Sequence, residues 1–342
     1  MARSAAVRVL KVDPERPSPE AIAVAARALR EGGLVAFPTE TVYGLGADAL
    51  SAEAVARIYA AKGRPPDNPL IVHIGRPEDL ETVAREVPPL ARALMERFWP
   101  GPLTLVLPRS ERVPLATTAG LDTVAVRMPA HPVALALVRE AGVPVAAPSA
   151  NRSGRPSPTR AEHVLADLGE AVDLVLDGGP CPVGIESTVV DVTGPTPVVL
   201  RPGGLPREAL EEALGRPVPV GGGPELARRS PGTRYRHYAP AAPLVLAGQE
   251  EVAAVVQSLL AQGKAVGLLA RRDPGLRHPR LRARIVSGGV RRYARELFDA
   301  LRSLDAEGCQ VIVAEAVEER GLGLAIMDRL RRAASAPPPG GR

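Results

Sequence analysis

Short apolar runs rich in β-branched residues alternate with amphipathic helical segments along most of this chain. The run at 70–74 reads LIVHI, and comparable runs occupy 34–37, 103–107, 123–127, 143–147 and 172–176. Helical patterns separate these runs, among them 18–31, 51–61 and 131–140. Because apolar runs of this length form strands covered on both faces, the pattern predicts an α/β fold with a twisted, mixed or largely parallel sheet.

The regular pattern lapses once, between residues 217 and 241, where glycine and proline clusters indicate a linker. We therefore predict an N-terminal domain over 1–216 and a smaller, Rossmann-like α/β domain over 242–334, followed by a disordered tail over 335–342. The linker ends in TRYRHYAP, and aromatic and charged residues are unusual in a flexible spacer. We expect this segment to pack onto another part of the protein.

Composition narrows the class of protein. Of the 342 residues, 45% are apolar and 24% are charged, as in a globular protein. The N-terminus lacks a signal-peptide pattern and no apolar run approaches the ~18 residues of a membrane span, so we expect a cytoplasmic protein without membrane association. Cys181 and Cys309 lie far apart without metal-ligand spacing, which predicts two buried thiols and no protein-held metal.

The net charge of +5 raises the question of nucleic-acid binding. The charges are mixed along the chain, and aromatic residues, which stack on single strands, make up only 3%. A basic concave cleft that binds a phosphorylated small molecule would explain the same excess of positive charge. An RNA-binding or ribosome-associated module that uses the basic surface remains the alternative.

Polar residues follow several predicted strands. The segment PTETVYGLG, residues 38–46, follows the run at 34–37, and its two glycines allow the backbone to approach a ligand closely. Ligands bind at the carboxyl ends of strands in open α/β sheets. The alternative is an ordinary strand-to-helix connection, but the segments 62–64, 148–151 and 186–188 also carry polar residues at the ends of predicted elements.

One loop could hold a polyphosphate. Lys62, Arg64 and Asn68 lie within the proline-rich stretch KGRPPDNP, and two cations with an amide donor suit phosphate oxygens. The chain contains neither a P-loop nor a convincing dinucleotide fingerprint, so ATP would be bound through scattered side chains. A solvated basic loop is the competing interpretation.

Two residues of predicted strands are polar. Arg127 ends a buried run, where a guanidinium must be paired: either with a substrate carboxylate, or structurally with Asp122 or Glu186. His73 is either a core histidine satisfied by the backbone or a residue that faces a cleft. Ser157 is expected to cap a helix beginning at Pro158.

Taken together, the motifs resemble those of the YrdC-type threonylcarbamoyl-AMP synthases, in the longer branch with an extra C-terminal domain. The matching motifs occur in family order: PTETVYGLG, KGRPPDNPLIVH, WPGPLTLVL, DTVAVRMPAHP, APSAN, GIESTVVD, LRPG and RYRHYAP. The resemblance implies synthesis of L-threonylcarbamoyl-AMP from L-threonine, bicarbonate and ATP, with release of pyrophosphate. The product would pass to the tRNA threonylcarbamoyl transferase machinery for modification of tRNAs that read ANN codons, and direct RNA binding is left open.

The resemblance also implies roles for residues. L-Threonine would contact Thr41, His73, Arg127, Ser149 and Ser187. ATP would contact Lys62, Arg64, Asn68, Thr123, Asn151, Thr159, Arg201 and Tyr235, with Tyr238 as the alternative to Tyr235. Lys62 and Arg64 would act catalytically by neutralising charge on phosphate. Mg²⁺ is expected to arrive with ATP, and the linker is expected to close over the site as a lid. Two other classes of enzyme remain as alternatives: a hydrogenase-maturation carbamoyltransferase and a generic amino-acid adenylating enzyme.

Overall fold

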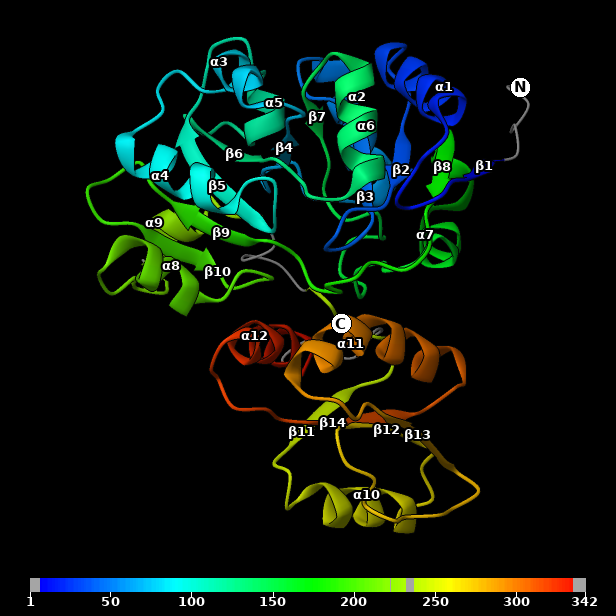
Figure 1. Cartoon of the computed structure of the whole chain (residues 1–342). Helices are drawn as coiled ribbons and strands as arrows, with labels where there is room; N and C mark the ends of the chain where they lie inside the picture. The colour runs from blue at the N-terminus through cyan, green and yellow to red at the C-terminus, as the bar shows by residue number, and fades with distance from the viewer. Residues whose placement is uncertain (1–6, 222, 232–236, 335–342) are drawn as a thin grey trace. The chain divides into compact units, whose positions relative to one another are not determined.

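The computed structural model describes residues 7–221, 223–231 and 237–334. The chain divides into two compact units, which Figure 1 shows. Unit 1 comprises Met1–Ser153, Pro158–Pro182 and Glu186–Arg234, and unit 2 comprises Gly154–Ser157, Val183–Ile185 and Tyr235–Arg342. The prediction of a mixed α/β fold followed by a smaller α/β domain is confirmed.

Unit 1 is built on a ten-stranded sheet in the order β1-β8-β2-β3-β7-β4-β6-β5-β9-β10. The sheet is mixed, since β1, β8 and β2 run parallel while β3, β7 and β4 pair antiparallel. Its strands are β1 (Arg8–Lys11), β2 (Val35–Phe37), β3 (Gly44–Asp48), β4 (Ile71–His73), β5 (Leu103–Pro108), β6 (Thr123–Arg127), β7 (Val145–Ala146), β8 (Leu174–Asp177), β9 (Thr188–Asp191) and β10 (Val198–Arg201).

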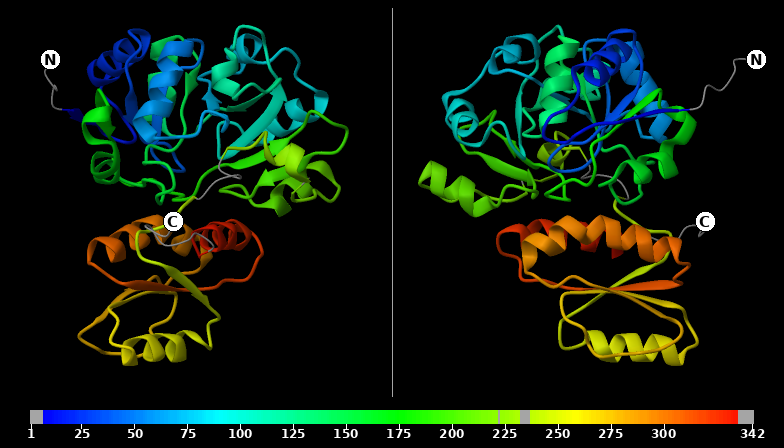
Figure 2. Two further views of the ribbon diagram at one scale, coloured as in Figure 1. Left: turned by 180° about the vertical axis from the view of Figure 1, so that it is seen from behind. Right: turned by 45° about the vertical axis from the view of Figure 1, so that its right-hand side comes forward.

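Helices of unit 1 begin where the sequence supplies capping groups. The Ser18 hydroxyl accepts a hydrogen bond from the Ala21 backbone N–H at 3.1 Å, and Pro19 occupies the first helical position. The helices are α1 (Pro19–Arg30), α2 (Ala52–Lys62), α3 (Leu80–Val83), α4 (Pro89–Phe98), α5 (Leu115–Thr118), α6 (Pro132–Ala141), α7 (Ala161–Leu168), α8 (Arg207–Leu214) and α9 (Gly223–Ala227). Helices α1 and α6 pack against each other on one face of the sheet, whereas α2 packs on the opposite face, and Figure 2 shows unit 1 from two further sides.

Two local predictions are wrong. The interpretation of residues 38–46 as a strand-to-helix connection is wrong, because β2 and β3 form an antiparallel hairpin with Phe37 opposite Gly44. Glycine is required at position 46, where a Cβ would lie 2.8 Å from the Phe37 ring. The second wrong prediction is the cap at Ser157, since α7 begins at Ala161 with Arg160 as its N-cap.

The two faces of the sheet in unit 1 differ. Alternate residues of β5 and β6, such as Leu105 and Val126, belong to the large core cluster. The residues between them face the other way and contribute to a much smaller apolar cluster of Ile71, Val106, Ala125, Val189 and Leu200, on which Leu226 of α9 packs. The same face carries a larger apolar cluster under α1 and α6, so the buried positions left for polar residues lie around β4, β6, β5 and β9.

Unit 2 contains a four-stranded, fully parallel sheet in the order β11-β14-β12-β13. Figure 1 shows α10 on one face of this sheet and α11 with α12 on the other. The elements are β11 (Leu244–Ala247), α10 (Val252–Ala261), β12 (Val266–Ala270), β13 (Leu281–Ile285), α11 (Val290–Ala306), β14 (Val311–Glu315) and α12 (Leu322–Ala334). Helices on both faces explain why β12 and β14 are buried throughout.

Within the described part of the chain, no helix combines the length and the apolar character needed to cross a membrane.

Candidate functional site

Arg127 lies at the end of β6 and is 4% exposed. Its Nη1 donates to the Thr41 hydroxyl at 2.9 Å and its Nε donates to the Gly101 carbonyl at 3.2 Å. Its Nη2 lies 2.6 Å from a carboxylate oxygen of Glu40. The structural partners suggested by the sequence, Asp122 and Glu186, are therefore wrong, because Glu40 is the carboxylate that faces this guanidinium.

The loop after β2 is held by its own hydroxyl groups. The Thr39 hydroxyl accepts hydrogen bonds from the backbone N–H groups of Thr41 at 3.1 Å and Val42 at 3.2 Å. The two threonine hydroxyls are 2.8 Å apart. Threonine side chains commonly stabilise turns in this way. The turn fixes the Thr41 hydroxyl, which is fully buried beside Arg127.

His73 on β4 is the register partner of Arg127 on β6. Its ring meets the ring of Phe37 edge-on, with centroids 6.4 Å apart. Burial, reinforced by the positive charge of Arg127, lowers the pKa of His73 to about 3. The imidazole is therefore neutral at physiological pH and adds no charge to the site.

Ser187 and Arg201 meet at the adjoining strands β9 and β10. Arg201 Nη2 donates to the Ser187 carbonyl at 2.9 Å and to its hydroxyl at 3.3 Å. The Ser187 hydroxyl also lies 2.7 Å from the hydroxyl of Thr104 on β5. A Cβ at Gly203 would lie only 2.4 Å from the Glu186 carbonyl oxygen, so the missing side chain permits this close packing.

Lys62 is the last residue of α2, and Gly63 ends the helix with a left-handed φ of 59°. The ammonium donates to the backbone carbonyls of Ser149 and Asn151, and Lys62 is only 2% exposed. The structure thus brings a residue of α2 together with the segment after β7. These three residues come from two motifs that lie almost ninety residues apart.

The loop that follows α2 folds back on itself. The Arg64 guanidinium donates to the carbonyls of Asn68 at 3.1 Å and Pro69 at 2.8 Å. Arg64 and Asn68 are both buried. The interpretation of this stretch as a solvated basic loop is therefore wrong, and the loop presents an ordered backbone.

Alternation places most of the polar residues on one face of the sheet. His73 shares the face of Ile71, Arg127 shares that of Ala125, and Thr104 shares that of Val106. Thr123, four residues before Arg127 on β6, faces the same side but lies at the opposite end of the strand. The predicted threonine-binding residues of β4 and β6 thus lie on the face with the small apolar cluster.

Thr159 and Tyr235 are two further predicted nucleotide contacts, and the structure describes only the first of them. The Thr159 backbone N–H donates to His163 at 3.2 Å, and its carbonyl accepts from the Cys181 N–H at 3.0 Å. Tyr235 lies outside the described residues. Its alternative, Tyr238, stacks on Phe298 of α11 with ring centroids 5.5 Å apart, so the ring of Tyr238 is packed within unit 2.

Two residues were missed by the sequence reasoning. Glu40 stands in the PTETVYGLG motif, and the sequence alone predicts no role for it. Thr104 stands in the WPGPLTLVL motif, as the only polar residue of a buried strand. The signal that finds both is a buried polar residue within or directly after an apolar strand.

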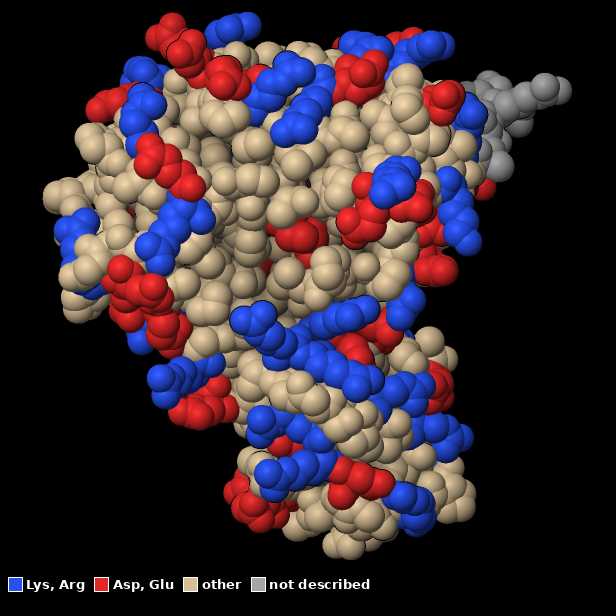
Figure 3. All heavy atoms as spheres, viewed as in Figure 1, with Lys and Arg blue, Asp and Glu red and all other residues tan. Residues whose placement is uncertain are grey.

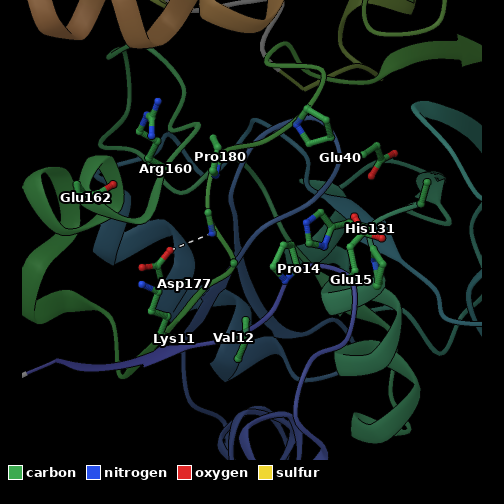
Figure 4. A pocket seen from close by; sticks show the side chains of 15 residues that line it. Lys11, Val12, Pro14, Glu15, Glu40, His131, Arg160, Glu162, Asp177 and Pro180 are labelled. Carbon is green, nitrogen blue, oxygen red and sulfur yellow. Dashed lines mark hydrogen bonds between the residues drawn. The ribbon is translucent and has the colours of Figure 1, made fainter.

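A cavity of about 670 Å³ adjoins this cluster, and Glu40 is part of its wall. Figure 4 shows Glu40 and His131 on one side and Arg160, Glu162 and Asp177 on the other. His131 caps α6, since its Nδ1 accepts a hydrogen bond from the Val133 N–H at 3.2 Å. Burial lowers the pKa of His131, although the nearby carboxylate of Glu40 opposes this shift.

The surface charges are interspersed. In Figure 3, Lys and Arg side chains alternate with Asp and Glu over the visible face of unit 1. On this face of unit 1 the charges are mixed, as they are along the sequence.

Comparisons with known proteins identify both parts of the chain. Residues 27–203 match the family model Sua5/YciO/YrdC, described as "Telomere recombination". Residues 205–335 match the model described as "Threonylcarbamoyl-AMP synthase, C-terminal domain".

Relatives that match this chain over nearly their whole length are named threonylcarbamoyl-AMP synthase. The threonylcarbamoyl-AMP synthase of Pyrococcus abyssi is 51% identical over 322 residues, which cover 91% of this chain and 93% of that protein. The threonylcarbamoyl-AMP synthase of Bacillus subtilis is 48% identical over 324 residues, covering 92% of each chain. The crystal structure of P. abyssi Sua5 complexed with L-threonine matches with a TM-score of 0.89 and 50% identity, and covers 95% of this chain and 97% of that one. The chain therefore belongs to the Sua5/YciO/YrdC family, and within it to the threonylcarbamoyl-AMP synthases that carry a C-terminal domain.

Proposed function

We propose that this enzyme makes L-threonylcarbamoyl-AMP from L-threonine, bicarbonate and ATP, and releases pyrophosphate. The observation that carries the proposal is the buried guanidinium of Arg127, which lies beside the Thr41 hydroxyl in a chain that matches a threonine-bound structure over nearly its full length. The product then serves the threonylcarbamoyl modification of adenosine in tRNAs that read ANN codons, after transfer to the tRNA threonylcarbamoyl transferase machinery.

The residues on the sheet face form the amino-acid site of this proposal. Arg127 binds the carboxylate of L-threonine, and the hydroxyl groups of Thr41 and Ser187 provide further hydrogen bonds. His73 is neutral because burial and Arg127 lower its pKa to about 3, so it contributes shape and hydrogen bonding without charge. Ser149, whose carbonyl is held by Lys62, closes the site from the segment after β7.

ATP binds beside it through residues of the 62–68 loop and the segment after β7. Lys62 and Arg64 compensate the negative charge of the phosphates, while Asn68 and Asn151 supply amide groups. Thr123, Thr159, Arg201 and Tyr235 complete the predicted contacts. Lys62 is buried against two backbone carbonyls, so the site is ordered before the nucleotide arrives. Such preorganised charge lowers the barrier of a reaction in which charge moves onto phosphate.

The chemistry proceeds in two balanced steps. The threonine ammonium and bicarbonate give a carbamate, one water molecule and one proton. A carbamate oxygen then attacks the α-phosphorus of ATP, and the bond to the bridging oxygen breaks so that pyrophosphate leaves with the bonding electrons. Both reactants of the second step are anions, and binding them side by side at cationic residues overcomes their repulsion and supplies proximity.

Mg²⁺ enters this proposal with the nucleotide. Among the described residues there is no group of three or more His, Cys, Asp or Glu side chains arranged to hold a metal ion. Oxygen ligands from ATP and water suit Mg²⁺, which usually keeps several waters and needs few protein ligands. Bound in this way, it would help to neutralise the phosphates.

The test is pyrophosphate release, measured with ATP, L-threonine and bicarbonate omitted in turn. We expect release only when all three are present. Release without bicarbonate would indicate simple amino-acid adenylation. Absence of release in the complete mixture, together with salt-sensitive RNA binding in a filter assay, would favour the RNA-binding module instead.

We also propose that the linker over 217–241 acts as a lid. Its first part belongs to unit 1: Leu226 packs on the small apolar cluster, and Arg229 Nη1 lies 3.0 Å from an Asp191 carboxylate oxygen. The Arg201 guanidinium donates to the Pro231 carbonyl at 3.1 Å, which ties this segment to a predicted ATP-binding residue. A closed lid would protect the intermediate from water.

A chain that ends after Arg216 tests the lid. We expect lower product yield and faster decay of the intermediate in this chain. The matched control is Arg229→Ala in the full chain, which removes the ion pair but keeps the linker. Unchanged turnover and unchanged intermediate lifetime in the shortened chain would contradict the lid.

A further inference from the structure

Glu40 is a buried carboxylate whose bonding is incomplete. Only 7% of the residue is exposed, and one oxygen lies 2.6 Å from Arg127 Nη2. Within the described residues, neither oxygen of Glu40 has a hydrogen-bond partner of good geometry, and the same holds for Arg127 Nη2. A buried carboxylate normally accepts several hydrogen bonds, because an unsatisfied one is costly. This pair is therefore arranged for a further partner.

The charges of this pair cancel. Arg127 is positive and Glu40 is negative, so the pair itself is neutral overall. An amino acid in its zwitterionic form is also neutral, and binding it buries no net charge. An anion that lacks the ammonium would leave one excess negative charge in a buried site, and a cation that lacks the carboxylate would leave one excess positive charge. Burial of an uncompensated charge is strongly unfavourable.

The surroundings of the pair favour an exchange of partners. Arg127 is held on its other side by the Thr41 hydroxyl and the Gly101 carbonyl, so it keeps its place when the contact with Glu40 loosens. Glu40 lines the cavity of about 670 Å³, in which its side chain has room to move. The guanidinium is thus the fixed partner and the carboxylate is the movable one.

We propose that Glu40 binds the α-ammonium group of the substrate and occupies the Arg127 guanidinium while the site is empty. When the amino acid binds, its carboxylate takes the place of Glu40 on Arg127, and Glu40 accepts hydrogen bonds from the ammonium. Glu40 thereby makes the site specific for α-amino acids and holds the nitrogen that later forms the carbamate. This inference rests on the proposed binding of L-threonine at Arg127 and adds a recognition element to it.

Calorimetric titration of the full chain with three ligands tests this role. The ligands are L-threonine, 3-hydroxybutanoate, which lacks the ammonium, and threoninol, which lacks the carboxylate. We expect the unmodified protein to bind both analogues at least about thirtyfold more weakly than L-threonine, the lower range for loss of one partner of a buried charge pair. Equal affinity for L-threonine and 3-hydroxybutanoate would overturn the role of Glu40 without any variant.

The informative variant is Glu40→Gln. It should bind L-threonine at least about tenfold more weakly, and its preference for L-threonine over 3-hydroxybutanoate should fall at least about tenfold, because the anion no longer meets a carboxylate. A preference equal to that of the unmodified protein would overturn the inference. Glu40→Asp retains the charge and should restore most of the preference, which a merely structural role would not do.

Glu15→Gln is the matched control. Glu15 lines the same cavity but is exposed and forms no ion pair with Arg127. Its ligand preference should equal that of the unmodified protein, and an equal loss in both variants would overturn a specific role of Glu40. The two proposals fail differently. If the unmodified protein binds no L-threonine, the proposed function is wrong, whereas tight L-threonine binding with unchanged preference in Glu40→Gln refutes only the role of Glu40.

Discussion

Two buried carboxylates, one in each unit, are paired with arginines in different ways. In unit 2, Glu315 ends β14, and its two oxygens accept hydrogen bonds from the Arg271 backbone N–H at 2.7 Å and the Arg271 Nε at 3.1 Å. In unit 1, Glu40 faces Arg127 at 2.6 Å, yet neither of its oxygens has a well-formed hydrogen bond within the described residues. The hydrogen bonding between Glu315 and Arg271 is therefore complete, whereas that between Glu40 and Arg127 is incomplete.

This difference separates a structural ion pair from the one to which we assign a role in binding. A pair with satisfied hydrogen bonds maintains a fold, because removing either partner leaves a buried charge. A pair with unsatisfied atoms keeps charge in place for a ligand.

The largest expected effect distinguishes the two arginines. Arg127→Ala should reduce transition-state stabilisation by about 2–4 kcal/mol, measured as kcat/KM for pyrophosphate release, because it removes a charged contact to the substrate. Arg271→Ala should lower the stability of unit 2 and leave kcat/KM of the folded protein near normal. Equal losses of kcat/KM in the two variants would erase the distinction between the pairs.

Lys62 provides the next comparison, against Lys264 of unit 2. Lys62→Ala should also cost about 2–4 kcal/mol in transition-state stabilisation, with the larger part expressed in the dependence on ATP. Lys264→Ala removes a partly exposed cation and should change the rate very little. Steady-state kinetics with ATP varied at saturating L-threonine measures both. A normal rate in Lys62→Ala would mean that the phosphates bind elsewhere.

The lowered pKa of His73 predicts that the stability of unit 1 depends on pH. Its pKa is lowered from 6.5 to about 3 by burial and by Arg127, so the unfolded chain binds more protons than the folded one between these values. Stability should therefore fall as the pH drops below 6.5. The loss from this one group should reach about 2 kcal/mol at pH 5.

Chemical unfolding at pH 7 and pH 5 measures this contribution. His73→Gln should lose about 2 kcal/mol less than the unmodified protein on acidification, whatever its stability at pH 7. An unaltered pH dependence in His73→Gln would show that the pKa of His73 is the same in the folded and the unfolded chain.

The smallest expected effect concerns Thr104. Thr104→Val keeps the shape of the side chain and removes the hydroxyl that lies 2.7 Å from the Ser187 hydroxyl. L-Threonine binding should weaken by about 1 kcal/mol, the usual net contribution of one hydrogen bond. Thr118→Val removes a hydroxyl that donates to the Leu121 carbonyl at 2.8 Å and should affect only stability. Calorimetry with L-threonine would reveal whether Thr104 matters only for folding.

The sequence predicted the strands and helices well because apolar periodicity reports burial directly. It predicted the α/β class and the second, smaller α/β domain. It failed at the segment after β2, where the hairpin depends on Gly46 fitting beneath Phe37, a contact that periodicity does not encode. The helix expected from Pro158 begins three residues later, at Ala161, because Arg160 is the cap in place of Ser157.

In the candidate site, residue types were predictable but their partners were not. A guanidinium at the end of a buried strand demanded a partner, and the sequence offered several carboxylates. Asp122 is only five residues from Arg127 in the sequence. Its carboxylate oxygen nevertheless pairs with another arginine, since it lies 3.8 Å from Nη2 of Arg109. Glu40 meets Arg127 because β2 and β6 belong to one twisted sheet whose order is set by long-range pairing. Such pairing depends on the whole fold, so neighbouring residues in the sequence were poor guides.

The absent side chain at Gly203 has a consequence for natural variation. Even a methyl group there would overlap the backbone of 186–187 and push Ser187 away from Arg201 and Thr104. A mutational scan should therefore find position 203 as intolerant as the charged positions, although it contributes no functional group. Inherited changes at this glycine would act as loss-of-activity alleles while leaving every reactive residue intact.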